Sequence, residues 1–369
     1  MKHAAWPAFD LVKCLCVMGM VLVHGFYWTW TMHGRFILPA DSAWFVAFQW
    51  GMFLGICPLM LPFLAGVALR LRLSTQHTKT GQPIENRLAS LFLQCLVIAV
   101  LGYAMNVFAA GWYVFWAWNV LQLVAVSFLV IGCLYARRSI WPVAALGILM
   151  LAVSDPLRGW IAGESRGKVL RVLLGDPSDW HQWPIFPWMS TVVFGFVLAD
   201  SYSRLNHENF VRLCAITGVL FSLIAAVSGR IMPVFDPHNL IGSQLMQPPA
   251  VDVLGLVGLI LLAFGGLTAV QDRLHFQRYG LVRCFSGGIL AIYLVHMIVG
   301  VRLHDLVFNH IDHAAVVNAL GQGWHPFFMA GFPVLLLLLS WAVGYATIRW
   351  LHGKRYSIRL RKAALSPRA

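Results

Sequence analysis

Long apolar stretches recur along the chain and constrain its fold more than any other feature. A helix that crosses the hydrocarbon core of a bilayer needs about 20 predominantly apolar residues. Of the 369 residues, 59% are hydrophobic and only 11% are charged, whereas soluble domains carry about 25% charged residues. The sequence therefore predicts an all-α polytopic integral membrane helical bundle, with residues 1–369 forming a single transmembrane domain. The ten predicted spans lie near 9–30, 44–69, 88–109, 115–135, 140–154, 184–200, 211–229, 251–270, 284–301 and 327–350.

The lysines and arginines between these spans indicate how the chain is oriented. Cytoplasmic loops of membrane proteins carry an excess of these residues. With the N-terminus inside, 19 of the 27 basic residues fall on cytoplasmic segments and seven on external ones. Both termini are therefore predicted to be cytoplasmic, and we expect an integral protein of a bacterial inner membrane, surrounded by lipid. The same bias explains the net charge of +13 without nucleic acid as a partner.

Three ionisable side chains interrupt the first span, which runs from Phe9 to Trp30. Ionisable groups inside a membrane helix are costly and indicate a functional site by default. Lys13 and His24 are separated by about three helical turns, roughly 16 Å along the axis, so they share one face. Asp10 precedes Lys13 by three residues on that same face. The alternative interpretation is an ion pair near one membrane edge together with a structural histidine.

A second histidine is predicted at the same depth as His24. The first and ninth spans both run outward, which places His24 and His296 towards the external side, where they could line one cavity. Tyr293, one turn before His296, could orient its ring. A histidine of ordinary pKa, near 6.5, can take a proton from a hydroxyl and return it to a thiolate. We therefore predict a catalytic set of Asp10, Lys13 and His24 on the first span and His296 on the ninth.

Four short motifs occur in a fixed order along most of the chain. They are Asp10-x-x-Lys13 with His24 after ten further residues, Pro62-Phe63-Leu64-Ala65-Gly66, Trp118-Asn119-Val120-Leu121-Gln122, and Ile292-Tyr293-Leu294-Val295-His296. In this order they resemble the membrane acyltransferase-3 family and its relatives akin to heparan-α-glucosaminide N-acetyltransferase. Lys13 stands where the family usually has arginine, and lysine lacks the planar donor fork of arginine.

The resemblance implies a transmembrane acyltransferase. Its donor would be a cytoplasmic acyl-CoA, with acetyl-CoA as the expected form. The acyl group would reach His24 through the membrane interior and pass to a hydroxyl or amine of an external acceptor, expected to be a glycan. A carbonyl attacked in a dry cavity also needs donors for the developing oxyanion. Asn119, Gln122, Tyr293 and Gln49 are the candidates, and the choice among them stays open.

Coenzyme A is strongly anionic and requires basic partners. The densest basic cluster on a predicted inward loop follows the second span and includes Arg70, Arg72 and Arg87. Arginine suits phosphate because its donors form a fork. We predict that these three residues bind the donor, together with Lys13 at the same cytoplasmic end. The alternative role of the cluster is to set the membrane topology.

Two other functions remain open at this point. A proton-coupled transporter or flippase could use His24 and His296 as an intramembrane relay, although transporters often carry paired broken helices and no such pair is evident here. A non-catalytic membrane scaffold is the third interpretation. The seven cysteines lie in or beside the spans and show no zinc spacing, so neither a metal nor a disulfide framework is predicted.

Overall fold

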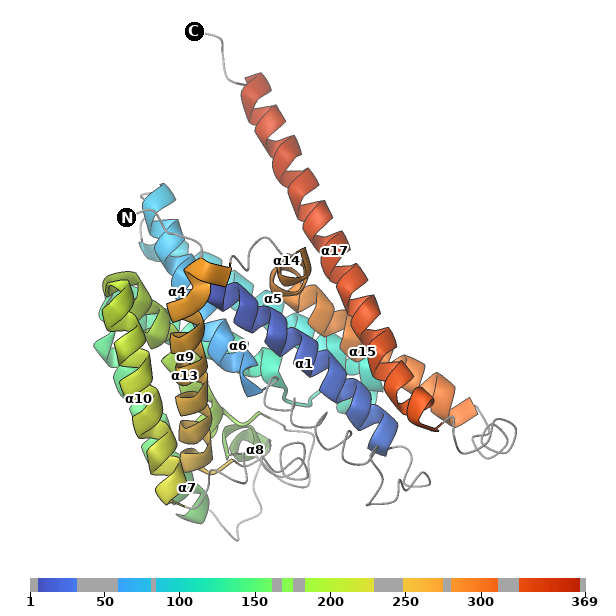
Figure 1. Ribbon diagram of the computed structural model, residues 1–369, viewed down its shortest axis with the longest axis horizontal. Helices are drawn as coiled ribbons and strands as arrows, with labels where there is room; N and C mark the ends of the chain where they lie inside the picture. Colours follow the sequence, from blue (N-terminus) through green and yellow to red (C-terminus); the bar gives the residue numbers. More distant parts are fainter. Residues whose placement is uncertain are drawn as a thin grey trace. The chain divides into compact units, whose positions relative to one another are not determined.

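Helices account for nearly all of the regular structure in this computed structural model. It describes residues 6–31, 59–80, 84–160, 168–174, 183–228, 248–274, 280–310 and 325–365, and within these ranges there is no strand. Eight of the described helices are long and apolar enough to cross a membrane, and one bent pair would make a ninth. The chain is therefore an all-α polytopic membrane protein, as the sequence predicts (Figure 1).

Most predicted spans coincide with one helix each. These are α1 (Pro7–Thr31), α5 (Ile84–Ala110), α6 (Val120–Leu134), α7 (Trp141–Trp160), α9 (Ile185–Arg204), α10 (His207–Val227), α13 (Ala250–Leu274) and α17 (His325–Leu365). Two short 3-10 helices, η1 (Trp112–Val114) and η2 (Tyr135–Arg137), and the short helix α8 (Lys168–Leu174) lie between them. Residues 44–58 of the second predicted span, 44–69, lie outside the described residues. The end of this span falls on α4 (Leu61–Thr80). The cytoplasmic position of both termini stays a prediction.

The ninth predicted span, 284–301, falls on two helices rather than one. It divides into α14 (Gly280–Gly287) and α15 (Ile289–His310), whose axes are bent by 75°. Gly288 lies at the break, where a Cβ atom would come within 2.8 Å of the Cα atom of Gly344 in α17. The apolar sequence pattern continues through the break, so hydropathy alone does not reveal it. The break accompanies the close approach of α17, which depends on residues far away in the sequence.

The chain divides into two compact units, each of which is considered by itself. The first contains Gly55–Leu274, and the second combines Trp6–Leu54 with His275–Ala369. The single domain predicted over residues 1–369 stays a prediction. His24 and His296 both fall in the second unit, and the arginines after the second predicted span fall in the first.

In the first unit, α4 and α9 approach until their backbones touch. A Cβ atom on Gly66 would overlap the carbonyl oxygen of Val192, and one on Gly195 would overlap that of Phe63. Apolar helices in lipid gain nothing from burying apolar surface against each other, so close van der Waals contact through small residues stabilises them instead. Gly66 ends one of the four sequence motifs, and this contact is the physical reason for a glycine there.

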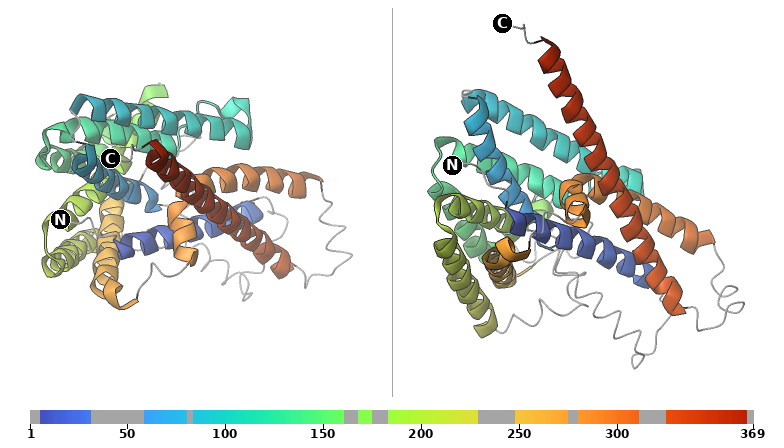
Figure 2. Two further views of the ribbon diagram at one scale, coloured as in Figure 1. Left: turned by 90° about the horizontal axis from the view of Figure 1, so that it is seen from above. Right: turned by 45° about the horizontal axis from the view of Figure 1, so that its top comes forward.

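α10 follows the same principle on a surface that faces outward. Large apolar side chains lie exposed along one side of the helix, as expected for contact with lipid chains. That exposed row comprises Ile216, Leu220, Leu223 and Val227. On the opposite side, a Cβ atom on Gly218 would come within 2.9 Å of the carbonyl oxygen of Gly258 in α13. The two helices therefore lie side by side at close distance (Figure 2).

The second unit is built from α1, α14, α15 and α17, with α1 in contact with the other three. Two glycines allow the close contacts around the C-terminal half of α1. A Cβ atom on Gly25 would come within 2.7 Å of the Cα atom of Pro333 in α17. A Cβ atom on Gly300 in α15 would overlap the ring of Trp28. Both contacts involve residues of α1 that directly follow His24, within about one helical turn of it.

Replacing Gly66 by alanine should destabilise the protein. The added methyl group meets the backbone of Val192, which cannot rotate away, and overpacking typically costs about 1–3 kcal/mol. The control is Gly266→Ala in α13, where the added Cβ meets no atom of the described residues within 4 Å outside the nearby backbone of its own helix. Alanine is favoured over glycine in a helix by about 0.5–1 kcal/mol. Thermal unfolding in detergent should place the midpoint of Gly66→Ala well below that of Gly266→Ala. Equal midpoints would refute the backbone contact between α4 and α9.

Candidate functional site

The predicted ion pair on the first helix is present. The Asp10 carboxylate lies 2.8 Å from the Lys13 ammonium, and the two side chains are 31% and 18% exposed. Asp10 also lies in the first turn of α1, where a negative charge is favoured by the helix dipole. The Lys13 Nζ atom lies 4.4 Å from the centroid of the Phe9 ring. The ammonium is therefore held from two sides and stays partly accessible.

The structure brings the two predicted histidines into direct contact. Nδ1 of His24 lies 3.0 Å from Nε2 of His296, and the two rings are nearly parallel with an interplanar angle of 8°. The other ring nitrogen of His296, Nδ1, lies 2.9 Å from the carbonyl oxygen of Ile292. His296 is completely buried, whereas His24 is partly accessible. One nitrogen of His24, Nε2, is thus left outside this chain of hydrogen bonds.

Aromatic rings restrain both imidazoles. The Trp28 ring stacks on His24, with centroids 5.5 Å apart. The Tyr293 ring meets His296 edge to face, with centroids 5.6 Å apart. Gly300 lies one turn after His296, just as Trp28 lies one turn after His24, so the glycine leaves room for the indole beside the paired histidines. Matching i,i+4 spacings on α1 and α15 therefore build this site.

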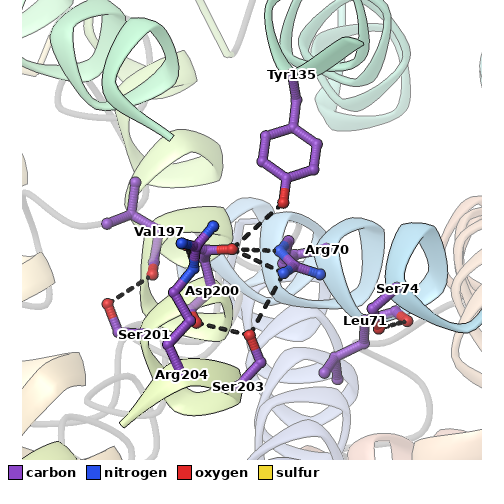
Figure 3. A network of polar contacts seen from close by, with 9 residues as sticks. All are labelled: Arg70, Leu71, Ser74, Tyr135, Val197, Asp200, Ser201, Ser203 and Arg204. Carbon is purple, nitrogen blue, oxygen red and sulfur yellow. Dashed lines mark hydrogen bonds and ion pairs between the residues drawn. The ribbon is translucent and has the colours of Figure 1, made fainter. Parts of the chain in front are cut away.

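A second polar cluster lies in the first unit, around the buried carboxylate of Asp200 near the end of α9 (Figure 3). Nε and Nη2 of Arg70, from α4, both lie 2.7 Å from Oδ1 of Asp200. Nε of Arg204 lies 2.7 Å from Oδ2. The Tyr135 hydroxyl donates to Oδ1 at 3.4 Å, and Nη2 of Arg70 also donates to the Ser203 hydroxyl at 3.4 Å. The cluster joins α4, η2 and α9 and carries one net positive charge.

The predicted donor-binding arginines occupy different environments. Arg70 is only 8% exposed and its guanidinium faces Asp200. Arg72 is exposed, because two residues on a helix turn the side chain by about 200° around the axis. Arg87 lies in the first turn of α5. Arg70 thus links α4 to α9 through its ion pair with Asp200, whereas the Arg72 side chain lies at the surface of α4.

The Trp118–Gln122 motif forms the start of α6. The Asn119 side chain accepts from the Leu121 amide, and the Gln122 side chain accepts from the Asn119 amide, which makes a reciprocal cap. The Asn119 amide group also donates to Asn106 of α5 at 2.6 Å, and the Trp118 indole donates to the carbonyl of Trp183 at 2.8 Å. These bonds show a structural use for the motif.

Of the candidates for binding an oxyanion, Asn119 is therefore engaged with other protein groups. Buried Gln122 keeps its Nε2 donor without a protein partner among the described residues. Tyr293 lies in the second unit beside His296, and Gln49 lies outside the described residues. The choice among these groups stays open.

Sequence reasoning missed Asp200 and its partners Arg204 and Tyr135. A signal was available, because Asp200 ends the predicted span 184–200 and an ionisable residue inside a span indicates a specific partner. The partner itself, Arg70, lies 130 positions earlier in the chain, and no local pattern connects the two. Among the described residues, no three His, Cys, Asp or Glu side chains are grouped as they would be to hold a metal.

Removing the Asp200 carboxylate should destabilise the protein strongly. Asp200→Ala leaves the buried Arg70 guanidinium without its counter-charge, and breaking a buried pair typically costs about 3–5 kcal/mol. The double variant Arg70→Met/Asp200→Leu should recover much of the loss, because well-packed apolar residues can replace a buried ion pair. Thermal unfolding in detergent measures both.

The matched control is Glu208→Ala, which breaks an exposed ion pair with Arg212 that should contribute only about 0–1 kcal/mol. A loss for Asp200→Ala no larger than that of Glu208→Ala would contradict the burial of this cluster.

The comparison with known protein families agrees with this architecture. The family model for the catalytic region of heparan-alpha-glucosaminide N-acetyltransferase matches residues 6–235, more than half of the chain. The match includes Asp10, Lys13, His24 and the Arg70–Asp200 cluster, and His296 lies beyond it. No curated protein matches the sequence. The chain therefore belongs to the heparan-alpha-glucosaminide N-acetyltransferase catalytic family.

Proposed function

We propose that this protein is a transmembrane acyltransferase. It moves an acetyl or other short acyl group from cytoplasmic acyl-CoA to a hydroxyl or amine of an extracytoplasmic acceptor, with a glycan as the acceptor class and a bacterial inner membrane as its location. The observation that carries the proposal is the contact between His24 and His296 inside the second unit. Family membership supplies the acetyltransferase chemistry, and the histidine pair supplies a base for it.

His24 acts as the general base in this proposal. Its partly accessible ring takes a proton from the acceptor hydroxyl or amine while the new bond to the acyl carbon forms. The carbon–sulfur bond of the thioester then breaks, and the same proton passes to the departing thiolate. The products are the acylated acceptor and free CoA thiol, so atoms and charge balance. His296 supports His24 through the direct hydrogen bond.

Cationic groups are proposed to bind the acyl-CoA donor. Arg72 is exposed on α4 and, with Arg87 on α5, is assigned to the donor phosphates. Arg70 belongs to the same cluster but is held by Asp200, so we assign it to fixing α4, which carries Arg72. Lys13 is assigned to a polar part of the donor, with Asp10 limiting its net charge.

A transporter remains the second candidate because one observation favours it. α14 and α15 are bent by 75° at Gly288, and broken helices often line transport sites. In that case the two histidines would pass protons during solute movement. Family membership favours the enzyme, and the two functions differ in whether the protein transfers an acyl group at all.

His24→Ala should abolish acyl transfer while leaving folding and expression intact. Loss of a general base typically lowers the rate about 10²–10⁴-fold. The assay uses purified protein in liposomes, labelled acetyl-CoA and a glycan acceptor on the opposite side. The control is His207→Ala, which removes an exposed histidine at the start of α10 and should retain full activity. Transfer by His24→Ala at the wild-type rate would eliminate the proposed mechanism.

Donor binding should depend on the arginines of α4 and α5 and on salt. Arg72→Gln and Arg87→Gln, singly and together, should weaken acetyl-CoA binding, and binding should fall as salt rises because charges are screened over about 8–10 Å near physiological ionic strength. Calorimetric titration at two salt concentrations measures both effects. Arg212→Gln, which removes an exposed arginine of α10, should bind normally. If the wild type binds no acyl-CoA at any salt and His24 supports proton-coupled solute uptake, the transporter replaces the enzyme.

A further inference from the structure

The two ring nitrogens of His296 face different kinds of group. Nδ1 faces the carbonyl oxygen of Ile292 at 2.9 Å, and Nε2 faces Nδ1 of His24 at 3.0 Å. A carbonyl oxygen can only accept a hydrogen bond, and a neutral imidazole has one donor and one acceptor nitrogen. The identity of the group at one end of this chain therefore decides the proton positions along all of it.

We propose that His296 is a positioning residue that fixes the tautomer of His24 and leaves Nε2 of His24 as the basic nitrogen. Facing a carbonyl, Nδ1 of His296 must carry the proton, which makes its Nε2 the acceptor. Nδ1 of His24 must then donate to that acceptor. With its proton on Nδ1, neutral His24 has its lone pair on Nε2, the nitrogen outside the hydrogen-bonded chain.

A protonated His296 would reverse this result and is disfavoured by its surroundings. An imidazolium would donate from both nitrogens, so His24 would accept at Nδ1 and carry its proton on Nε2, where no base would remain. His296 is 0% exposed, and among the described residues no carboxylate forms an ion pair with it. Burying an unpaired charge is costly, so the neutral pair is the arrangement that the site supports.

The surrounding contacts keep the donor and acceptor nitrogens face to face. Trp28 stacks on the His24 ring and fits against Gly300, and Tyr293 restrains the His296 ring from its edge. A neutral histidine without a partner favours the tautomer with the proton on Nε2. His24 therefore requires an acceptor at Nδ1 to hold the reactive form, and His296 is the group that provides it.

This inference rests on the proposed acyl transfer. The proton of the hydroxyl or amine that receives the acyl group moves to Nε2 of His24 as the oxygen–carbon or nitrogen–carbon bond forms. The same proton then passes from Nε2 to sulfur as the carbon–sulfur bond breaks. The Nδ1 proton stays on His24 throughout and keeps its hydrogen bond to His296, which stabilises the transient imidazolium. His296 takes up no proton in either step and touches neither substrate.

The test combines spectroscopy with kinetics on the full-length protein in lipid nanodiscs. Nitrogen NMR of ¹⁵N-histidine-labelled protein distinguishes the two tautomers, and the His24 signal is the one that disappears in His24→Gln. We expect a protonated Nδ1 in the wild type. His296→Met removes the acceptor with little change in size and should move the proton to Nε2. It should also lower kcat about 10²-fold or more without changing acetyl-CoA binding.

His296→Gln keeps a side-chain acceptor and should retain kcat within about tenfold of the wild type. A wild-type His24 protonated on Nε2 would overturn the inference. The inference would also be overturned if the His296→Met variant kept the wild-type tautomer of His24 and the wild-type rate. The proposed function would survive that result. If the tautomer changes as expected but no protein transfers acyl groups, the inference on His296 is supported and the proposed function is overturned.

Discussion

Water is absent from the hydrocarbon interior of a membrane, so each polar group buried there needs a partner within the protein. Two clusters among the described residues meet this constraint. In the first unit, Asp200 binds Arg70 and Arg204 and joins α4 to α9. In the second unit, His296 uses both ring nitrogens, one for a main-chain carbonyl and one for His24. The first arrangement leaves no oxygen of its carboxylate unused, whereas the second leaves one nitrogen available, and that difference separates a structural cluster from a candidate active site.

The same absence of water explains why glycines determine the helix contacts. Because apolar side chains gain nothing from leaving lipid for another apolar surface, helices associate where backbones can approach. Gly66 and Gly195 do this between α4 and α9, and Gly218 does so between α10 and α13. In the second unit, Gly25 and Gly300 allow close contacts next to the histidine pair. These helix contacts, together with the stacking of Trp28 on His24, restrain the positions of the two imidazoles.

Features that depend on one helix could be predicted from the sequence, whereas most features that depend on the contact of two helices could not. The membrane spans follow from apolar length, and the Asp10–Lys13 pair follows from helical spacing. The shared depth of His24 and His296 required the predicted topology as well, and the contact between their rings agrees with it. The break at Gly288 was missed because it depends on the approach of α17. The bond from Arg70 to Asp200 was missed because each residue, judged from its neighbours in the sequence, is a charged residue at the end of a span.

The hydrogen-bonded chain through the two histidines ends at the carbonyl oxygen of Ile292. A main-chain carbonyl can accept a hydrogen bond but cannot take up a proton and pass it on. A proton therefore cannot travel along this hydrogen-bonded chain beyond Ile292. A proton taken by His24 would have to leave by the face through which it arrived. Acyl transfer through this pair would therefore move no net charge along the histidine chain, and its rate would not respond to the membrane potential through that route.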